Sequence, residues 1–241
     1  VQIDEINRVI NINQIIQGSR IYFINGNLNN IKIIYKGFQI KENSNFNLKA
    51  PPKNYPIDEK GLTGCLSLIN LNTHNIDINI DDSSCEDSVN FINVNGLVNS
   101  IKIKNSFSDG LDVDFSNLEF NSINIFNAGN DCADFSLGNY KIEDLQLKNC
   151  GDKALSIGEK STVELNNMNA SMSNIGIASK DSSLVYLNNA DFKNLKTCIA
   201  AYNKKQEFNG GFVKIKKMKC DNYIKKFAID KYSIILQQDK I

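Results

Sequence analysis

Residues 101–117 read IKIKNSFSDGLDVDFSN, and residues 123–139 read INIFNAGNDCADFSLGN. Both stretches contain an alternating apolar run that ends at an asparagine, a short polar link, and a second run that begins with an aspartate. Two sets of residues recur at steps of 22: Asn105, Asn127 and Asn149, and Asp87, Asp109 and Asp131. A fixed period of this length indicates a solenoid in which each repeat forms one turn, or rung.

Each repeat contains two or three short alternating runs of strand type, separated by Asn, Gly, Ser or Asp. A leucine-rich repeat does not fit, because it needs a helical stretch and a fixed leucine frame. We therefore predict an all-β protein, a parallel β-helix whose successive rungs lie about 4.8 Å apart. Its core would be built from stacked inward side chains: Leu111, Val113, Ala133, Phe135, Leu155, Ile157, Ile175 and Ile177.

The recurring asparagines are expected to form a ladder at one corner, with their amides hydrogen-bonded up and down the stack. Residues 61–220 would form the β-helix core and residues 221–241 a final rung or stub. Residues 1–60 would form N-terminal rungs or a cap, with a Pro-containing loop at 51–56. Since open ends of a sheet invite association, we expect either other domains of a longer chain or an assembly to cover them.

The rung pattern resembles the right-handed parallel β-helix superfamily that includes pectate-lyase-like proteins. The phrases NDCADFS (130–136), CGDKALSIGEKS (150–161) and NIGIASKDSS (174–183) are also similar to a β-helix domain of bacterial surface proteins. That domain is sometimes found beside kinase domains like those of a spore coat protein. The resemblance covers roughly residues 61–220. It implies a single-stranded right-handed parallel β-helix and carries no settled activity.

The six cysteines fall into three pairs, each about one rung apart: Cys65 with Cys85, Cys132 with Cys150, and Cys198 with Cys220. Neighbouring rungs bring such residues close enough for disulfide bonds. Three disulfides would place the protein in an oxidising compartment, extracellular, at the cell surface or in the periplasm. The alternative is a reduced chain in which cysteine fills small core sites.

Lysine and arginine together number 27, as do aspartate and glutamate, so the formal net charge is zero. This balance argues against nucleic-acid binding by bulk electrostatics. From Lys196 onward, however, eleven lysines face four acids, which suggests a charged partner or pairing between halves. No apolar run is long enough to predict a membrane span.

The acids of the quoted stretches should form two columns on one outward face. Asp87, Asp109 and Asp131 would form the first, followed by Lys153 in the next rung. A second column would run through these residues: Asn90, Asp112, Asp134 and Ser156. Carboxylates one rung apart repel each other and raise each other's pKa, so something must compensate.

Three kinds of compensation are open. Turn amides could donate to the aspartates that begin each strand, and lysines of later rungs could pair with the acids. A calcium ion could also bind carboxylates from two adjacent rungs. Its candidate ligands are Asp109, Asp112, Asp131 and Asp134.

Lysines follow the acids along the same face. Lys160, Lys180 and Lys204 are expected near one register, where they could form a basic column or simply be solvated turn residues. Tyr202 could stack on a sugar ring, or it could simply be a partly buried residue at a strand end. Together with Asp112 and Asp134, these residues predict a surface that binds a polysaccharide, with an anionic one favoured.

The leading functional hypothesis is therefore an exported β-helix domain that engages polysaccharide. One alternative is a calcium-dependent lyase or epimerase acting on uronates, with Lys153 or Lys180 as the base. A glycoside hydrolase would use the carboxylates in pairs, but the His–Gly and Arg–x–Lys phrases of polygalacturonases are missing. A purely structural or assembly module remains the third reading.

Overall fold

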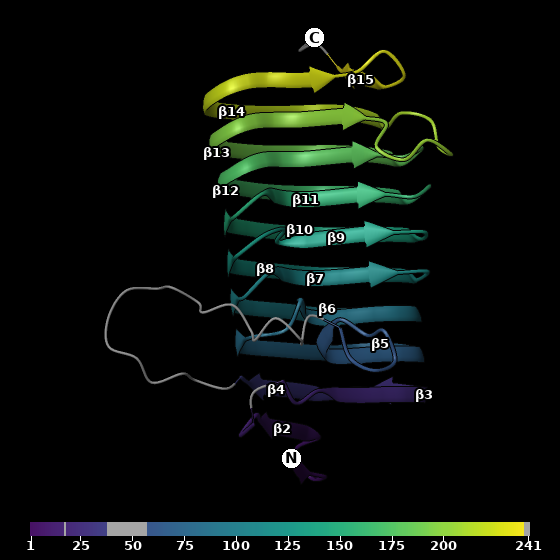
Figure 1. The fold of residues 1–241 in the computed structure, drawn as a ribbon, viewed down its shortest axis with the longest axis vertical. Helices are drawn as coiled ribbons and strands as arrows, with labels where there is room; N and C mark the ends of the chain where they lie inside the picture. Colours follow the sequence, from purple (N-terminus) through teal and green to yellow (C-terminus); the bar gives the residue numbers. More distant parts are fainter. Residues whose placement is uncertain (17, 38–56, 239–241) are drawn as a thin grey trace.

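The computed structural model describes residues 1–16, 18–37 and 57–238. They form an all-β solenoid of about 10 turns, with the two ends of the chain at opposite ends of the stack (Figure 1). The predicted fold and its rung of about 22 residues are confirmed. The Pro-containing loop predicted at 51–56 lies outside the described residues.

Fifteen strands are present in the described ranges, and nearly all of them pair in parallel with the rung above or below. Only β1 and β2 pair antiparallel. The strands are β1 (Gln2–Asp4), β2 (Val9–Asn13), β3 (Ile21–Asn29), β4 (Lys32–Lys36), β5 (Gly64–Ser83), β6 (Asp87–Ser106), β7 (Asp109–Asp114), β8 (Asn117–Ala128), β9 (Ala133–Ser136), β10 (Asn139–Cys150), β11 (Lys153–Gly158), β12 (Thr162–Lys180), β13 (Leu184–Tyr202), β14 (Phe212–Ile229) and β15 (Ile234–Gln237).

The pairing is interrupted at corners, which divide each complete rung into three faces. The first face contains β7, β9 and β11 with residues 87–92, 175–180 and 197–202. The second face contains residues 95–98, 117–120, 139–142, 162–165, 184–187 and 212–215. The third face contains residues 100–104, 122–126, 144–148, 167–171, 189–193 and 217–221.

Both ends of the described chain continue this architecture. β2 pairs in parallel with β4, and β4 with β5, so the N-terminal strands add rungs below the core. At the other end, β14 carries residues 212–229 through all three faces, and β15 pairs with it on the second face.

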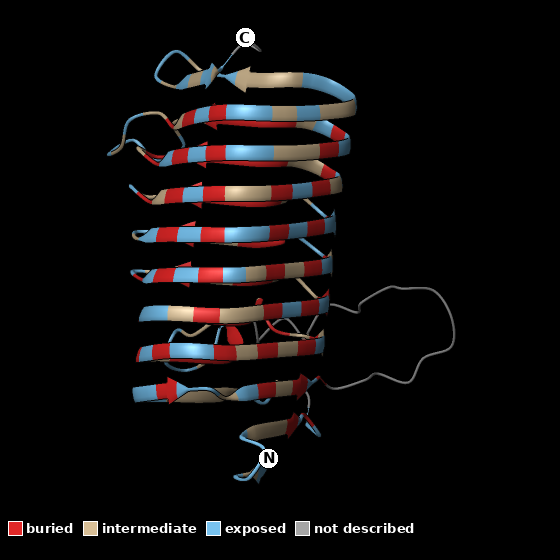
Figure 2. Cartoon of the chain, turned by 180° about the vertical axis from the view of Figure 1, so that it is seen from behind, coloured by how far each residue is buried: buried red, intermediate tan, exposed pale blue. Residues whose placement is uncertain are grey.

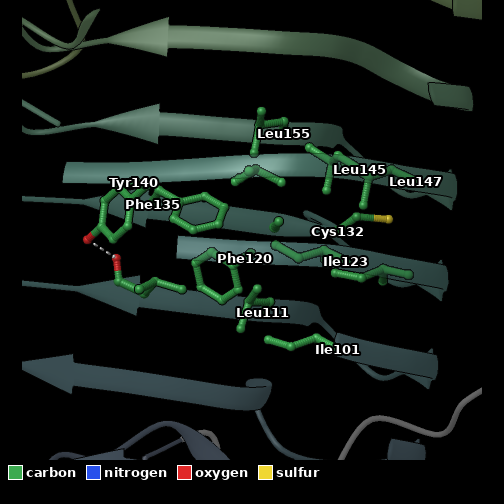
Figure 3. Close-up of a cluster of buried hydrophobic side chains, with 14 of the residues drawn as sticks. Ile101, Leu111, Phe120, Ile123, Cys132, Phe135, Tyr140, Leu145, Leu147 and Leu155 are labelled. Atoms are coloured by element: carbon green, nitrogen blue, oxygen red, sulfur yellow. Dashed lines mark hydrogen bonds between the residues drawn. The ribbon is translucent and has the colours of Figure 1, made fainter. Parts of the chain in front are cut away.

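Buried and exposed residues alternate along many of the strands, as the colours of Figure 2 show from behind. In the middle of the core, the rings of Phe120 and Phe135 meet edge to face at 5.9 Å, and Tyr140 packs beside Phe135 at 4.8 Å (Figure 3). The buried Tyr140 hydroxyl lies 2.8 Å from the carbonyl of Ser136 and 3.1 Å from that of Val113, so its polar end is satisfied.

Seven of the eight predicted inward residues are fully buried: Leu111, Val113, Ala133, Phe135, Leu155, Ile157 and Ile177. The prediction for Ile175 is wrong. This residue pairs with Lys153, which places it in the outward column of Asp131, and it is only half-buried. Gly176 takes the inward position instead, where a β-carbon would lie 2.5 Å from the carbonyl oxygen of Cys198.

The asparagine ladder is confirmed at the corner between the third and first faces. Asn149 donates its side-chain amide to Asn127 at 2.7 Å, Asn127 donates to Asn105 at 3.0 Å, and Asn105 donates to Asp82 at 2.8 Å. Each asparagine also has a positive φ of about 60°, a backbone conformation that asparagine tolerates better than most residues. The sequence therefore meets the steric and the hydrogen-bonding needs of this corner with one residue type.

The three predicted disulfides are confirmed: Cys65–Cys85, Cys132–Cys150 and Cys198–Cys220. Each closes a loop of about one rung, and together they indicate an oxidising, extracellular type of environment. In the described ranges, no helix is long and apolar enough to cross a membrane.

We expect Asn127→Ala to lower the free energy of unfolding by about 2 kcal/mol, because it removes two ladder hydrogen bonds and places alanine at positive φ. Asn127→Gly removes the same hydrogen bonds without the steric cost, so its loss should be about half as large. Urea denaturation of both variants measures the difference. Two variants as stable as the parent would contradict a stabilising ladder.

We expect Cys132→Ala with Cys150→Ala to lower the free energy of unfolding by about 3 kcal/mol. The disulfide joins residues 18 positions apart, so it restricts a loop of that length in the unfolded chain. The urea midpoints of the oxidised parent, the reduced parent and the variant provide the test. The reduced parent serves as a control, because it should be at least as destabilised as the variant. An unchanged midpoint in the variant would refute the bond's contribution.

Candidate functional site

The first column of the acidic face runs through Asp87, Asp109, Asp131 and Lys153. The carboxylate of Asp109 accepts the backbone N–H of Asp131 at 2.9 Å and the side-chain amide of Asn130 at 2.8 Å. Asp131 in turn accepts the backbone N–H of Lys153 at 2.9 Å. The predicted turn-amide role is confirmed for these two aspartates, each of which binds the backbone of the following rung.

The second column lies at the centre of the first face. Its register is as predicted, and Ser67 extends it by one rung: Ser67, Asn90, Asp112, Asp134 and Ser156. The Asn90 amide donates to the Asp112 carboxylate at 2.9 Å. The side chain of Asp134 keeps 24% of its surface exposed, so the middle of the column reaches solvent.

Most of this column has unused hydrogen-bonding capacity. Within the described residues, four of its buried atoms make no hydrogen bond: Ser67 Oγ, Asn90 Oδ1, Asp134 Oδ1 and Ser156 Oγ. Buried polar atoms without a partner are costly and uncommon in proteins. Ser67, Asn90 and Ser156 are almost completely buried, so a ligand at the surface could reach this column only at Asp112 and Asp134.

Burial changes the acid–base behaviour of the carboxyl groups. It raises the pKa of Asp112 well above the usual range, and the negative charges of Asp87, Asp114 and Asp134 add to the rise. Burial likewise raises the pKa of Asp109 to about 6, although the hydrogen bond from Asp131 opposes it. The Asp112 carboxyl group therefore favours its protonated form more than an exposed aspartate does.

Lys153, a candidate base, is held by acids on two sides. Its Nζ lies 3.2 Å from Asp131 Oδ2 and 2.5 Å from Asp152 Oδ2. Burial alone would lower the pKa of Lys153, but the hydrogen bonds and charges of Asp152 and Asp131 outweigh it and raise the pKa. Because a general base must be unprotonated, this position suits charge balance better than proton abstraction.

Lys180, the second candidate base, reaches the acids across an intervening rung. Its buried side chain passes over Gly158, where a β-carbon would lie 3.4 Å from Lys180 Cε, and its Nζ ends 3.7 Å from Asp134 Oδ2. The side chain is only 5% exposed. The predicted lysine compensation is thus confirmed for Asp131 and Asp134, by Lys153 and Lys180.

The other predicted binding residues do not gather into one column. Lys180 lies in register with Tyr202, not with Lys204. Lys160 is at the corner beside the first face, with its Nζ 5.8 Å from the Phe208 ring centre, and Lys204 donates its backbone N–H to Asp181 at 2.7 Å. The loop after β13 breaks the 22-residue spacing, which is why the predicted register fails there.

One charged pair at the edge of the face was not predicted from the sequence. Glu159 forms an ion pair with Lys205 at 2.5 Å and accepts the hydroxyl of Ser136. The repeat could have located Glu159, since it follows Phe115 and Leu137 at steps of 22 and shares their positive φ. Its partner lies in the irregular loop, where the period gives no guidance.

The proposed calcium ligands do not converge. Among residues 1–16, 18–37 and 57–238, no group of three or more acidic, histidine or cysteine side chains is arranged to hold a metal ion. Asp109 and Asp131 already use oxygens to bind backbone amides, and Asp131 also pairs with Lys153. These four aspartates therefore do not fit a calcium site as they are arranged, and calcium binding stays a prediction without structural support.

Comparisons with known proteins do not assign the chain to a family. No family model matches it, and neither a curated protein nor a solved structure matches it significantly. The resemblance to pectate-lyase-like proteins therefore rests on the solenoid fold alone.

We expect the protein to be less stable at pH 8 than at pH 5. In this window the raised pKa values make folded Asp109, Asp112 and Asp114 bind more protons than they do when unfolded, so stability falls as pH rises. Thermal melting at both pH values measures the difference. Asp112→Asn should reduce it, and a melting temperature that stays constant or increases at pH 8 would contradict the raised pKa values.

Proposed function

We propose that the first face binds a polysaccharide, with Asp112 and Asp134 in contact with sugar hydroxyls. The observation that carries this proposal is the pair of partly exposed carboxyl groups, Asp112 and Asp134, stacked on successive rungs at the centre of the face. A sugar hydroxyl both donates and accepts hydrogen bonds, so it complements a carboxyl group in either protonation state. An apolar ligand would leave these carboxyl groups unsatisfied.

The geometry of the face favours an extended polymer over a single sugar. Partly exposed residues occur over five successive rungs along the solenoid axis, from Asp112 through Asp134 and Lys153 to Tyr202. Rungs are about 4.8 Å apart, so this surface extends for about 19 Å. A linear glycan lying along the axis could contact several rungs at once.

The charge balance favours a neutral glycan on this face, in place of the anionic one expected from the sequence. Two lysines, Lys153 and Lys180, pair with acids of this face, which carries these acids on or beside its described strands: Asp87, Asp109, Asp112, Asp114, Asp131 and Asp134. An anionic polymer would approach carboxyl groups whose charge these two lysines offset only in part.

Glycosidic-bond hydrolysis is a second candidate, supported by the environments of Asp112 and Asp134. Asp112 favours the protonated form, as a general acid must, while Asp134 on the next rung forms an ion pair with Lys180. Two neighbouring carboxyl groups with such different surroundings are the arrangement that glycosidases use. Asp112 would donate a proton to the glycosidic oxygen, and the Asp134 carboxylate would stabilise the developing positive charge or activate water.

A lyase or epimerase is less well supported. Its chemistry needs a cation at the uronate carboxylate and an unprotonated base. The four aspartates do not converge on a cation position, and neighbouring acids raise the pKa of Lys153.

We expect Asp112→Asn with Asp134→Asn to weaken glycan binding at least about tenfold, because the charge-assisted hydrogen bonds that sugar hydroxyls donate to the Asp134 carboxylate are lost. The probes are six-sugar oligomers of neutral glucans, xylans, mannans and galactans, assayed by isothermal calorimetry. Release of reducing ends in the same mixtures tests hydrolysis.

The matched control is Glu119→Gln with Glu164→Gln, which removes two exposed charges from the second face and should leave binding unchanged. Circular dichroism checks that both double variants are folded. If none of the neutral oligomers binds the parent protein, or if both double variants lose binding equally, the proposal fails. Binding without release of reducing ends would reject hydrolysis alone.

A further inference from the structure

A groove of about 960 Å³ runs along the outside of the third face. It crosses seven successive rungs, from β4 through β5, β6, β8, β10 and β12 to β13. At about 4.8 Å per rung its length is about 29 Å. This groove is separate from the acidic columns, since it lies on a different face.

One column in this groove carries a lysine on every second rung. In order along the stack, the column contains Lys36, Asp81, Lys104, Phe126, Lys148, Ser171 and Lys193. The lysines are therefore spaced by two rungs, or about 9.6 Å. This distance is close to the length of two linked sugar rings in an extended chain.

The positive charge of the groove is mostly uncompensated. Lys36, Lys104 and Lys148 are exposed and form no ion pair with any other residue that the structure describes. Lys102, on the same rung as Lys104, is also exposed and unpaired. Lys193 pairs with Asp191 at 3.5 Å but keeps 55% of its side chain exposed.

The neighbouring column supplies groups that suit sugar hydroxyls. It contains the amides Asn79, Asn124, Gln146 and Asn169, with Lys102 among them. The exposed ring of Phe126 lies in the lysine column, between Lys104 and Lys148. The Nζ atom of Lys148 is 5.5 Å from the centre of the ring. An aromatic ring beside amides and cations can pack against the apolar side of a sugar while its polar groups are bound.

We propose that this groove binds an acidic polysaccharide that carries one anionic group for every two sugar rings. The lysine spacing matches the charge spacing of such a polymer, and the amides and Phe126 match its sugar rings. A nucleic acid fits less well, because it carries a phosphate on every nucleotide and Asp81 and Asp191 would oppose it. The proposal is independent of glycan binding at the first face.

The test measures affinity for two carboxylated polysaccharides of equal chain length at low ionic strength. Hyaluronan carries one carboxylate for every two sugars, and polygalacturonate carries one on every sugar. If spacing decides affinity, hyaluronan binds at least as tightly as polygalacturonate despite its lower charge density. Lys104→Gln with Lys148→Gln should weaken hyaluronan binding about tenfold, through the loss of two surface ion pairs.

The matched control is Lys141→Gln with Lys214→Gln, which removes two exposed lysines from the second face. It should retain hyaluronan affinity within about twofold, because screening limits the effect of distant charges. Asp112→Asn with Asp134→Asn should also retain it, which separates this site from the acidic columns. The proposal is overturned by the absence of hyaluronan binding, by tighter binding of polygalacturonate or of duplex DNA, or by an equal loss in the lysine control.

Discussion

The structure depends on the backbone pairing of each rung with the next, most often at a step of 22 or 23 residues. In the middle of the stack this pairing is in register across all three faces, so a residue type that recurs at the period becomes a continuous column. Polar side chains reinforce it: Asp109 and Asp131 each accept the backbone N–H of the next rung, and Asn127 links Asn105 to Asn149. Short-range pairing of this kind makes the stability of a solenoid a sum over neighbouring rungs.

The same pairing generates the unusual chemistry of the first face. It stacks carboxyl groups that would otherwise stay apart, and burial then raises the pKa of Asp109 and Asp112. Among the stacked acids that the structure describes, Lys153 pairs with Asp131 and Lys180 with Asp134. The repeat that builds the scaffold thus also brings together a row of acids with raised pKa values.

Much of this arrangement could be predicted from the sequence, because a period of 22 converts directly into spatial columns. The corner asparagines, the disulfide pairs, the two acidic columns and seven core residues follow from it. Ile175 could not be placed, since Gly176 takes the inward position and moves the isoleucine into the outward column. Lys204 and Lys205 lie in a loop that breaks the period. The repeat therefore placed Lys204 in the wrong column, and it could not locate Lys205 as the partner of Glu159. The residues of the lysine column on the third face also recur at about this period. The hollow shape of the groove, however, depends on side-chain packing.

The most direct test of this account is a pH titration of the aspartate carboxyl carbons by nuclear magnetic resonance, with Asp112→Asn used to assign the central signal. The account predicts that Asp112 and Asp109 titrate well above the value of about 4 found in unfolded peptides, with Asp109 at about 6. If every aspartate of the first face titrates near 4, the carboxyl groups are neither buried nor stacked as described. The physical basis of the proposed first-face site would then be lost.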